Sequence, residues 1–328
     1  MGFVNGAAGA GESSDEPAVR PGGSETLSMT GEPERQYGAK PREPALSGRA
    51  WEKEFGYARN FLNNRFVYVV ISPRARGLSV GINMNPDKKC SFDCAYCEVN
   101  RDVVPRDQHL DVAVMVQELQ HTVRLALEGL RETPPYQSLP AELLELRQVV
   151  LSGDGEPTLC PNFREAVQAV AHLRALGKLP FFKLVLVTNG TGLDLPAVQS
   201  GLQLFTPQDE VWAKLDGGTP DYIAKINRPK VALAKVFANI LALGRQRPII
   251  IQSMFPLFNG EEPSAEEIGQ YVARLQELRD GGARIGLVQI YSAMRPTMHP
   301  ECGHLPLKTL SRIAQSVRTG TGLRAEVF

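Results

Sequence analysis

Short apolar segments rich in β-branched residues alternate with longer segments of helical periodicity from position 67 to the end of the chain. A strand buries a short apolar run or every second residue, whereas an amphipathic helix buries residues three and four apart. The pattern predicts strands at Val67–Ser72, Leu78–Met84, Gln148–Ser152, Lys183–Thr188, Glu210–Leu215, Ile249–Phe255 and Arg284–Tyr291. It predicts helices at Val112–Glu132, Phe163–Leu176, Pro196–Leu202, Ala232–Gly244, Ala265–Asp280 and Leu307–Val317.

This alternation is typical of a parallel α/β architecture. After the first strand, the pattern gives about six βα units, and periodicity alone allows either a doubly wound sheet or an open barrel. In both folds the loops after the carboxyl ends of the strands carry the functional site. Polar residues at those strand ends are therefore the candidates to consider.

Residues 1–48 lack the periodicity and are rich in Gly, Ser, Glu and Pro, which is the composition of a disordered segment. The sequence thus predicts a disordered tail at 1–48 and one domain at 49–328. With 43% hydrophobic residues, the chain can fill one large core. Its 36 basic and 36 acidic residues give a formal net charge of zero, so no overall basic excess indicates nucleic-acid binding.

No apolar run reaches the ~18 residues that a membrane-spanning helix needs. The chain has five cysteines, an odd number, and no secretory signal precedes them, so disulfides are not expected. We therefore expect a cytoplasmic protein without a membrane partner.

Three of the cysteines, Cys90, Cys94 and Cys97, are spaced as C-x3-C-x2-C. Three thiolates from one short loop can ligate three irons of a [4Fe-4S] cluster and leave the fourth iron open to a small molecule. A closed structural zinc site needs four protein ligands, and no second C-x2-C or H-x3-H pair follows in the sequence. Three unligated cysteines are the remaining alternative.

With Tyr96 in the position before the third cysteine, the motif resembles the signature of the radical S-adenosylmethionine (radical SAM) superfamily. The resemblance implies that the three thiolates hold a [4Fe-4S] cluster and that SAM binds the open iron. An electron from the cluster then cleaves SAM to methionine and a 5'-deoxyadenosyl radical. The resemblance also implies a partial (β/α)6 TIM-like barrel, with the cluster loop after its first strand. Tyr96 would lie near the adenine, or would pack beneath the cluster.

The second barrel strand is followed by Gly153, Asp154, Gly155 and Glu156. Glycines let the backbone approach a ligand closely, and a carboxylate can accept a hydrogen bond from an ammonium group. The segment resembles the Gly-Gly-Glu motif of the superfamily, which binds the amino group of SAM. Here Asp154 replaces the second glycine and Gly155 is inserted. An ordinary tight βα turn is the alternative.

Thr188 and Asn189 end the third barrel strand, and Lys214 and Asp216 end the fourth. The resemblance implies that these four residues contact the ribose hydroxyls and the carboxylate of SAM. Lys214 can pair with a carboxylate, and Asp216 can accept from a hydroxyl. Asn189 also fits an ordinary Asn-Gly turn.

Polar residues also occur in or after the later strands. Gln252 and Gln289 either point into the barrel or bond to neighbouring backbone, because a buried amide needs a partner. Arg228 and Arg295 each precede a proline and can bind a carboxylate or phosphate, or lie on the surface.

A second set of metal-binding residue types, His299, Cys302 and His304, falls close to the C-terminus. These three side chains form a possible weak metal site that is one ligand short of a closed tetrahedron.

Together the motifs most resemble the radical SAM branch that contains wyosine-type tRNA-modifying synthases, with similarity also to glycyl-radical activating enzymes. No second cysteine cluster or flavodoxin-like domain is recognised, so the expected partner is an external one-electron donor such as flavodoxin or ferredoxin. The predicted function is hydrogen abstraction from a small-molecule or peptide substrate, and no catalytic residue beyond the cofactor site is identified.

Two alternatives stay open. A tRNA-modifying enzyme would use local basic residues, and a non-enzymatic iron–sulfur protein would bind the cluster without SAM. The basic candidates are Arg65, Arg74, Arg76, Arg101 and Arg106.

Overall fold

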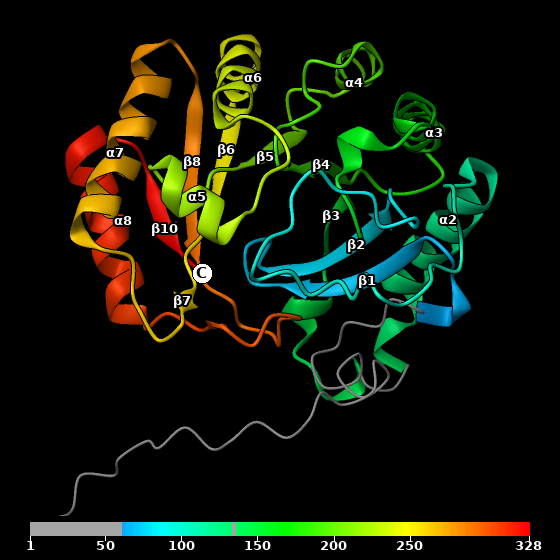
Figure 1. The fold of residues 1–328 in the computed structure, drawn as a ribbon. Helices are drawn as coiled ribbons and strands as arrows, with labels where there is room; N and C mark the ends of the chain where they lie inside the picture. Colours follow the sequence, from blue (N-terminus) through cyan, green and yellow to red (C-terminus); the bar gives the residue numbers. More distant parts are fainter. Residues whose placement is uncertain (1–60, 133–135) are drawn as a thin grey trace, which may run out of the picture. The chain divides into compact units, whose positions relative to one another are not determined.

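The computed structural model describes residues 61–132 and 136–328, so the predicted tail at 1–48 lies outside the described residues. The described chain forms one eight-stranded sheet whose outermost strands are β1 and β10 (Figure 1). Strand β1 pairs antiparallel with β2, and the remaining neighbours are parallel. In spatial order the strands are β1 (Val67–Ser72), β2 (Gly77–Asn83), β3 (Leu146–Ser152), β4 (Lys183–Thr188), β5 (Glu210–Lys214), β6 (Ile249–Met254), β8 (Ile285–Tyr291) and β10 (Ala325–Val327).

Each parallel strand from β2 to β8 in this sheet leads into a helix, and the helices surround the outside of the curved sheet (Figure 1). The sheet does not close, because β1 and β10 each have one neighbour in it. The predicted partial (β/α)6 barrel is therefore confirmed. The helices are α2 (Val112–Glu128), α3 (Phe163–Ala175), α4 (Pro196–Leu202), α5 (Pro220–Ile226), α6 (Leu233–Gln246), α7 (Ala265–Asp280) and α8 (Leu307–Thr321).

The two faces of the sheet differ in polarity. Residues that point towards the helices are fully buried and apolar, and they belong to the main hydrophobic core; examples are Val80, Ile82, Val149, Leu151, Leu186 and Ile251. On the opposite face a small apolar cluster of Val150, Val185 and Trp212 is followed, towards the carboxyl ends of the strands, by polar side chains. Because side chains alternate along a strand, one set of strands builds both a dry outer core and a polar interior.

The predicted strand and helix boundaries agree with the structure to within a few residues. The predicted helix at Val112–Glu132 is interrupted at Gly129, after which Leu130–Glu132 forms a separate 3-10 helix. Helix α5, which spans seven residues, and strand β10, which spans three, were not predicted. A two-stranded antiparallel sheet of β7 (Leu257–Phe258) and β9 (Cys302–Gly303) was also not predicted. In the described residues, no helix combines the length and apolarity needed to cross a membrane.

A buried ion pair ties α3 to the start of β5. Both guanidinium Nη atoms of Arg174 donate to the Asp209 carboxylate, at 2.7 and 2.9 Å, and Leu184 N donates to the same carboxylate at 2.7 Å. The Asp209 side chain is fully buried, which by itself raises its pKa, but the hydrogen bonds from Arg174 and the backbone outweigh burial and lower it. The ionised carboxylate is therefore part of the folded state.

We expect Asp209→Asn to lower the free energy of unfolding by about 3 kcal/mol, because it leaves the guanidinium of Arg174 buried without its counter-charge. Because the folded-state pKa of Asp209 is lowered, its stabilisation is complete above pH ~4 and is lost as the pH falls through the folded-state value. Urea unfolding of the wild type and of the Asp209→Asn variant, at pH 7 and at lower pH, measures the difference in the free energy of unfolding. Glu277→Gln, which removes the exposed pair with Arg274, should cost less than about 0.5 kcal/mol. Equal effects of the two substitutions would contradict the expectation.

Candidate active site

The three cysteines of the C-x3-C-x2-C motif lie in the loop between β2 and α2, and all three are free and partly exposed. In the described parts of the chain, no three His, Cys, Asp or Glu side chains lie close enough together to hold a single metal ion. Three thiolates on one short loop nevertheless make up the donor set of a [4Fe-4S] cluster that leaves one iron open.

The same finding means that His299, Cys302 and His304 do not form the possible metal site considered from the sequence. Cys302 is buried in β9, and His299 Nδ1 lies 3.9 Å from the carboxylate of Glu301.

The glycines after β3 pack directly against the loop that leads to Cys90. A Cβ atom on Gly155 would lie 2.0 Å from the carbonyl oxygen of Lys89, and one on Gly153 would lie 2.2 Å from Asn83 Oδ1. Gly153 also has a φ of 132°, which L side chains rarely adopt. Asp154 N donates to Asn83 Oδ1 at 3.0 Å. The turn thus requires glycine in order to contact the cysteine loop.

The carboxylate of Glu156 joins the ends of β3 and β4. It accepts hydrogen bonds from Thr158 N and Oγ1, from Thr188 Oγ1 and from Asn189 N, the last at 2.8 Å. Burial raises the pKa of Glu156, and these hydrogen bonds oppose the rise. Contact of Glu156 and Thr188 with SAM stays a prediction, and in this structure both side chains connect neighbouring strand ends.

Asn189 reaches from the end of β4 to the cysteine loop. Its Nδ2 lies 3.0 Å from Ser91 Oγ and 3.7 Å from Cys90 Sγ. Ser91 Oγ is also 2.7 Å from Thr191 Oγ1. The Asn-Gly turn therefore has a contact with a cysteine sulfur as well as a local conformational role.

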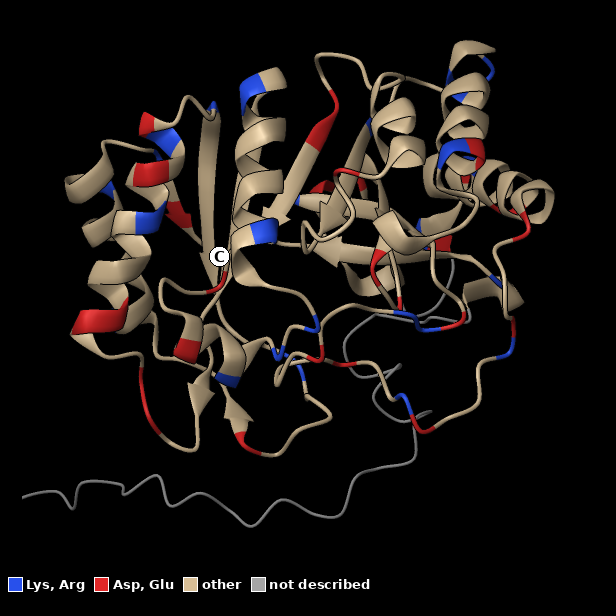
Figure 2. Cartoon of the chain, turned by 45° about the horizontal axis from the view of Figure 1, so that its top comes forward, with Lys and Arg blue, Asp and Glu red and all other residues tan. Residues whose placement is uncertain are grey.

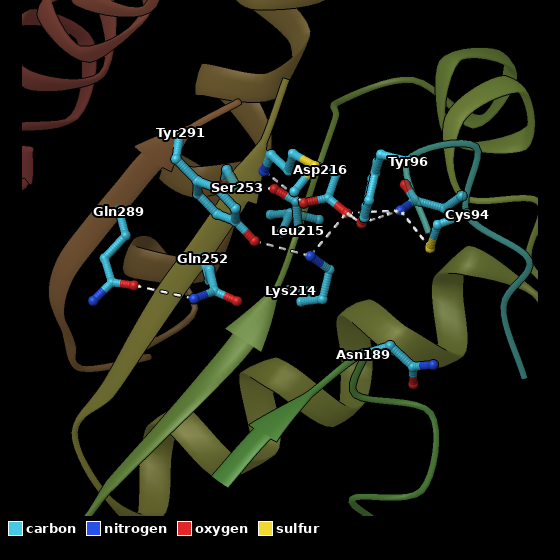
Figure 3. A network of polar contacts seen from close by, with 12 residues as sticks. Cys94, Tyr96, Asn189, Lys214, Leu215, Asp216, Gln252, Ser253, Gln289 and Tyr291 are labelled. Carbon is cyan, nitrogen blue, oxygen red and sulfur yellow. Dashed lines mark hydrogen bonds and ion pairs between the residues drawn. The ribbon is translucent and has the colours of Figure 1, made fainter. Parts of the chain in front are cut away.

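Asp216, directly after β5, is the centre of a buried polar network (Figure 3). Its carboxylate accepts from Tyr96 OH, from Asn227 Nδ2 at 2.7 Å and from Met254 N at 2.8 Å. Lys214 Nζ lies 3.7 Å from the same carboxylate. The network joins the cysteine loop, β5, β6 and the end of α5.

Lys214 is placed between two aromatic rings. Its Nζ is 4.8 Å from the centroid of the Tyr96 ring and donates to Tyr291 OH at 3.2 Å (Figure 3). Burial lowers the pKa of Lys214, but attraction to Asp216 and its other neighbours outweighs burial and raises the pKa overall. The ammonium group is therefore charged over the physiological pH range.

Asn227 is the site residue whose role the sequence analysis missed. Its Nδ2 contacts Cys94 Sγ at 3.5 Å and Tyr96 OH at 3.1 Å, in addition to Asp216. In this segment the sequence indicated only the neighbouring Arg228, as a residue that binds a carboxylate or phosphate or lies on the surface. Arg228 instead forms an ion pair with Glu301 at 2.8 Å, and Arg295 forms one with Glu98 at 3.1 Å.

The polar residues of the later strands face each other inside the barrel. Gln252 and Gln289 occupy paired positions on β6 and β8, and Gln252 Nε2 donates to Gln289 Oε1 at 3.3 Å (Figure 3). The two side chains are thus hydrogen-bonded to each other rather than to neighbouring backbone.

Four of the five basic residues considered for RNA binding contact other side chains of the described chain. Blue and red segments are interspersed over the helices and loops (Figure 2). Arg65, Arg76 and Arg101 lie within ion-pair distance of Asp107, Glu326 and Asp93, respectively. Arg74 stacks on the ring of Tyr291 at 4.4 Å. These contacts give RNA binding no support.

Comparison with known families shows the superfamily of the chain. The sequence model of the radical SAM superfamily matches residues 84–272, which include the cysteine loop and the strand ends around it. The chain belongs to the radical SAM superfamily. Radical SAM enzymes use a [4Fe-4S] cluster and SAM, in agreement with the cofactors expected from the sequence.

Among curated proteins, the chain is similar to a UPF0026 protein of Helicobacter pylori, with 24% identity over 220 residues, 66% of this chain and 64% of that protein. It is 31% identical over 166 residues to the UPF0026 protein slr1464 of Synechocystis, covering 50% of this chain and 52% of that protein. The chain thus spans about half to two thirds of the length of these curated relatives.

Among solved structures, a radical SAM methyltransferase from Sphaerobacter thermophilus has a TM-score of 0.55 at 16% identity, covering 80% of this chain and 68% of that chain. At this identity the likeness shows the fold alone.

We expect Gly155→Ala to displace the loop before Cys90, because the added methyl group overlaps the backbone of Lys89. Anaerobically reconstituted G155A should bind less than about half of the wild-type iron and sulfide, which a colorimetric assay measures. Gly269→Ala is the matched control, because its Cβ would meet nothing within 4 Å on helix α7. It should load iron normally and gain up to about 1 kcal/mol of stability. Normal loading of G155A would show that the glycine contact is dispensable.

Proposed function

We propose that this radical SAM enzyme holds its [4Fe-4S] cluster through Cys90, Cys94 and Cys97 and abstracts hydrogen from a small-molecule or peptide substrate. The observation that supports the proposal best is that side chains from the ends of β4 and α5 each direct an N–H group at a different cysteine sulfur. An N–H donor stabilises a thiolate. When bound, the cluster supplies the electron that cleaves SAM to methionine and a 5'-deoxyadenosyl radical.

The residues around the cysteines suit a zwitterionic, ribose-containing cofactor. Lys214 is a partly buried side chain whose pKa is raised by Asp216 and its other neighbours, and its ammonium group can pair with the carboxylate of SAM. Asp216 already accepts three hydrogen bonds, so its proposed part is to fix Tyr96 and Lys214 as well as to accept from a ribose hydroxyl.

The turn from Gly153 to Glu156 and the residues Thr188 and Asn189 complete the proposed SAM site. The glycines bring backbone close to the loop. Glu156 Oε2 accepts from Asn189 N, and a carboxylate oxygen can also accept from a second donor such as an ammonium group.

The substrate lies, in this proposal, inside the barrel beyond Lys214. There Tyr291 OH and the Gln252–Gln289 pair present hydrogen-bonding groups on the interior face (Figure 3). Such groups bind a polar molecule or a peptide backbone. They also position its C–H bond, while the enclosing barrel excludes water.

The electron comes from a separate protein in this proposal. The other two described cysteines, Cys160 and Cys302, are both buried and lie singly, so the described residues provide no second cluster. An external one-electron donor such as flavodoxin or ferredoxin would therefore reduce the cluster. This chemistry suits the reducing cytoplasm that was predicted from the sequence.

Substitution of Cys90, Cys94 or Cys97 by serine should abolish most cluster binding and reduce the formation of 5'-deoxyadenosine from SAM at least 100-fold, because each thiolate is a proposed ligand. Iron and sulfide analysis and chromatography of the products after dithionite reduction measure both effects. Cys160→Ser is the control: it should retain the cluster and activity. The proposal fails if the fully loaded wild-type protein does not cleave SAM, or if the serine variants keep a complete cluster.

A further inference from the structure

The segment that follows α5 lies along the cysteine loop on both sides of Cys94. Ala95 N donates to the carbonyl oxygen of Ile226 at 2.8 Å, and Asp93 N donates to that of Asn227 at 3.1 Å. These backbone hydrogen bonds fix the position of Asn227 relative to the cysteine between them.

The amide of Asn227 has one chemically determined orientation. Asp216 Oδ2 lies 2.7 Å from Nδ2, and because a carboxylate only accepts hydrogen bonds, the NH2 group must face it. The same NH2 group then lies 3.5 Å from Cys94 Sγ. In the described residues, Asn227 Oδ1 is buried and has no hydrogen-bond partner. The orientation is therefore set by the donor contacts of Nδ2, because a carboxylate cannot donate to Oδ1.

The other two sulfurs also have side-chain donors, at longer distances. Asn189 Nδ2 lies 3.7 Å from Cys90 Sγ, and Arg101 Nη2 lies 3.9 Å from Cys97 Sγ. Of the three donors, Asn227 is the nearest and the most deeply buried, at 1% exposure. A hydrogen bond to sulfur in a buried site is screened least by water.

We propose that Asn227 is a positioning residue that raises the reduction potential of the cluster through its N–H contact with the sulfur of Cys94. This inference rests on the proposed function, in which Cys94 is a cluster ligand. Reduction adds negative charge to a cluster and its thiolates, and hydrogen bonds to the sulfurs stabilise that charge. The hydrogen bond from Asn227 to Asp216 fixes the NH2 group that stabilises the charge on the sulfur of Cys94.

The test is an EPR-monitored redox titration of the reconstituted protein. We expect Asn227→Ala to lower the ratio of reduced to oxidised cluster at a fixed potential about threefold to tenfold, a shift of about 30 to 60 mV for a one-electron couple. Iron and sulfide content should equal that of the wild type, because Asn227 is not a ligand. An unchanged potential in the fully loaded variant would overturn the inference.

Glu301→Gln is the matched control. It weakens the ion pair with Arg228, which belongs to the same segment as Asn227 and has a left-handed φ of 46°. The substitution does not remove the donor to the sulfur. Its potential should equal that of the wild type. An equal shift in both variants would assign the effect to loosening of the segment and overturn the inference.

A second substitution allows the same measurement if N227A does not retain the cluster. Asn227→Ser keeps a small polar side chain that is too short to reach the sulfur, and it should show the same shift. A variant that loads fully and keeps the wild-type potential would refute the role of Asn227. Failure of the wild-type protein to load a cluster would instead refute the proposed function.

Discussion

The buried carboxylate of Asp216 is the interaction on which the site depends. A charge inside a protein is stable only when other groups compensate it, and Asp216 is compensated by Lys214, Tyr96, Asn227 and the backbone of Met254. These partners come from different parts of the barrel. Because the carboxylate needs all of them in place, it fixes the cysteine loop, two strands and the end of α5 relative to one another.

The partial barrel makes such a site possible because the two faces of its sheet differ in polarity. Its outer face packs apolar side chains against the helices, while its inner face has polar side chains towards the carboxyl ends of the strands. Strand ends that are distant in sequence therefore meet beside the cysteine loop. The stability of the outer core allows the inner face to keep costly polar groups such as the partly buried Lys214 and the buried Gln252–Gln289 pair.

The glycine turn after β3 shows how a departure from the family pattern is accommodated. Asp154 takes the place of a glycine, and it both accepts from Asn83 Nδ2 and donates its own N–H to Asn83 Oδ1, each at 3.0 Å. Gly153 and Gly155 keep the close backbone approach that this requires. The turn thus contacts the end of β2 through a paired hydrogen bond and the cysteine loop through close packing.

Periodicity and C-x3-C-x2-C spacing are local properties of the chain, and they were enough to predict the barrel strands, most helices, the cysteine loop and the family. The positions of Lys214, Asp216 and Asn189 at strand ends also made them candidates. The partners of the site residues became known from the folded arrangement: Asn227 contacts a cysteine far away in sequence, and Glu156 bonds to a neighbouring strand end. Such contacts depend on how distant elements pack, which no local pattern records.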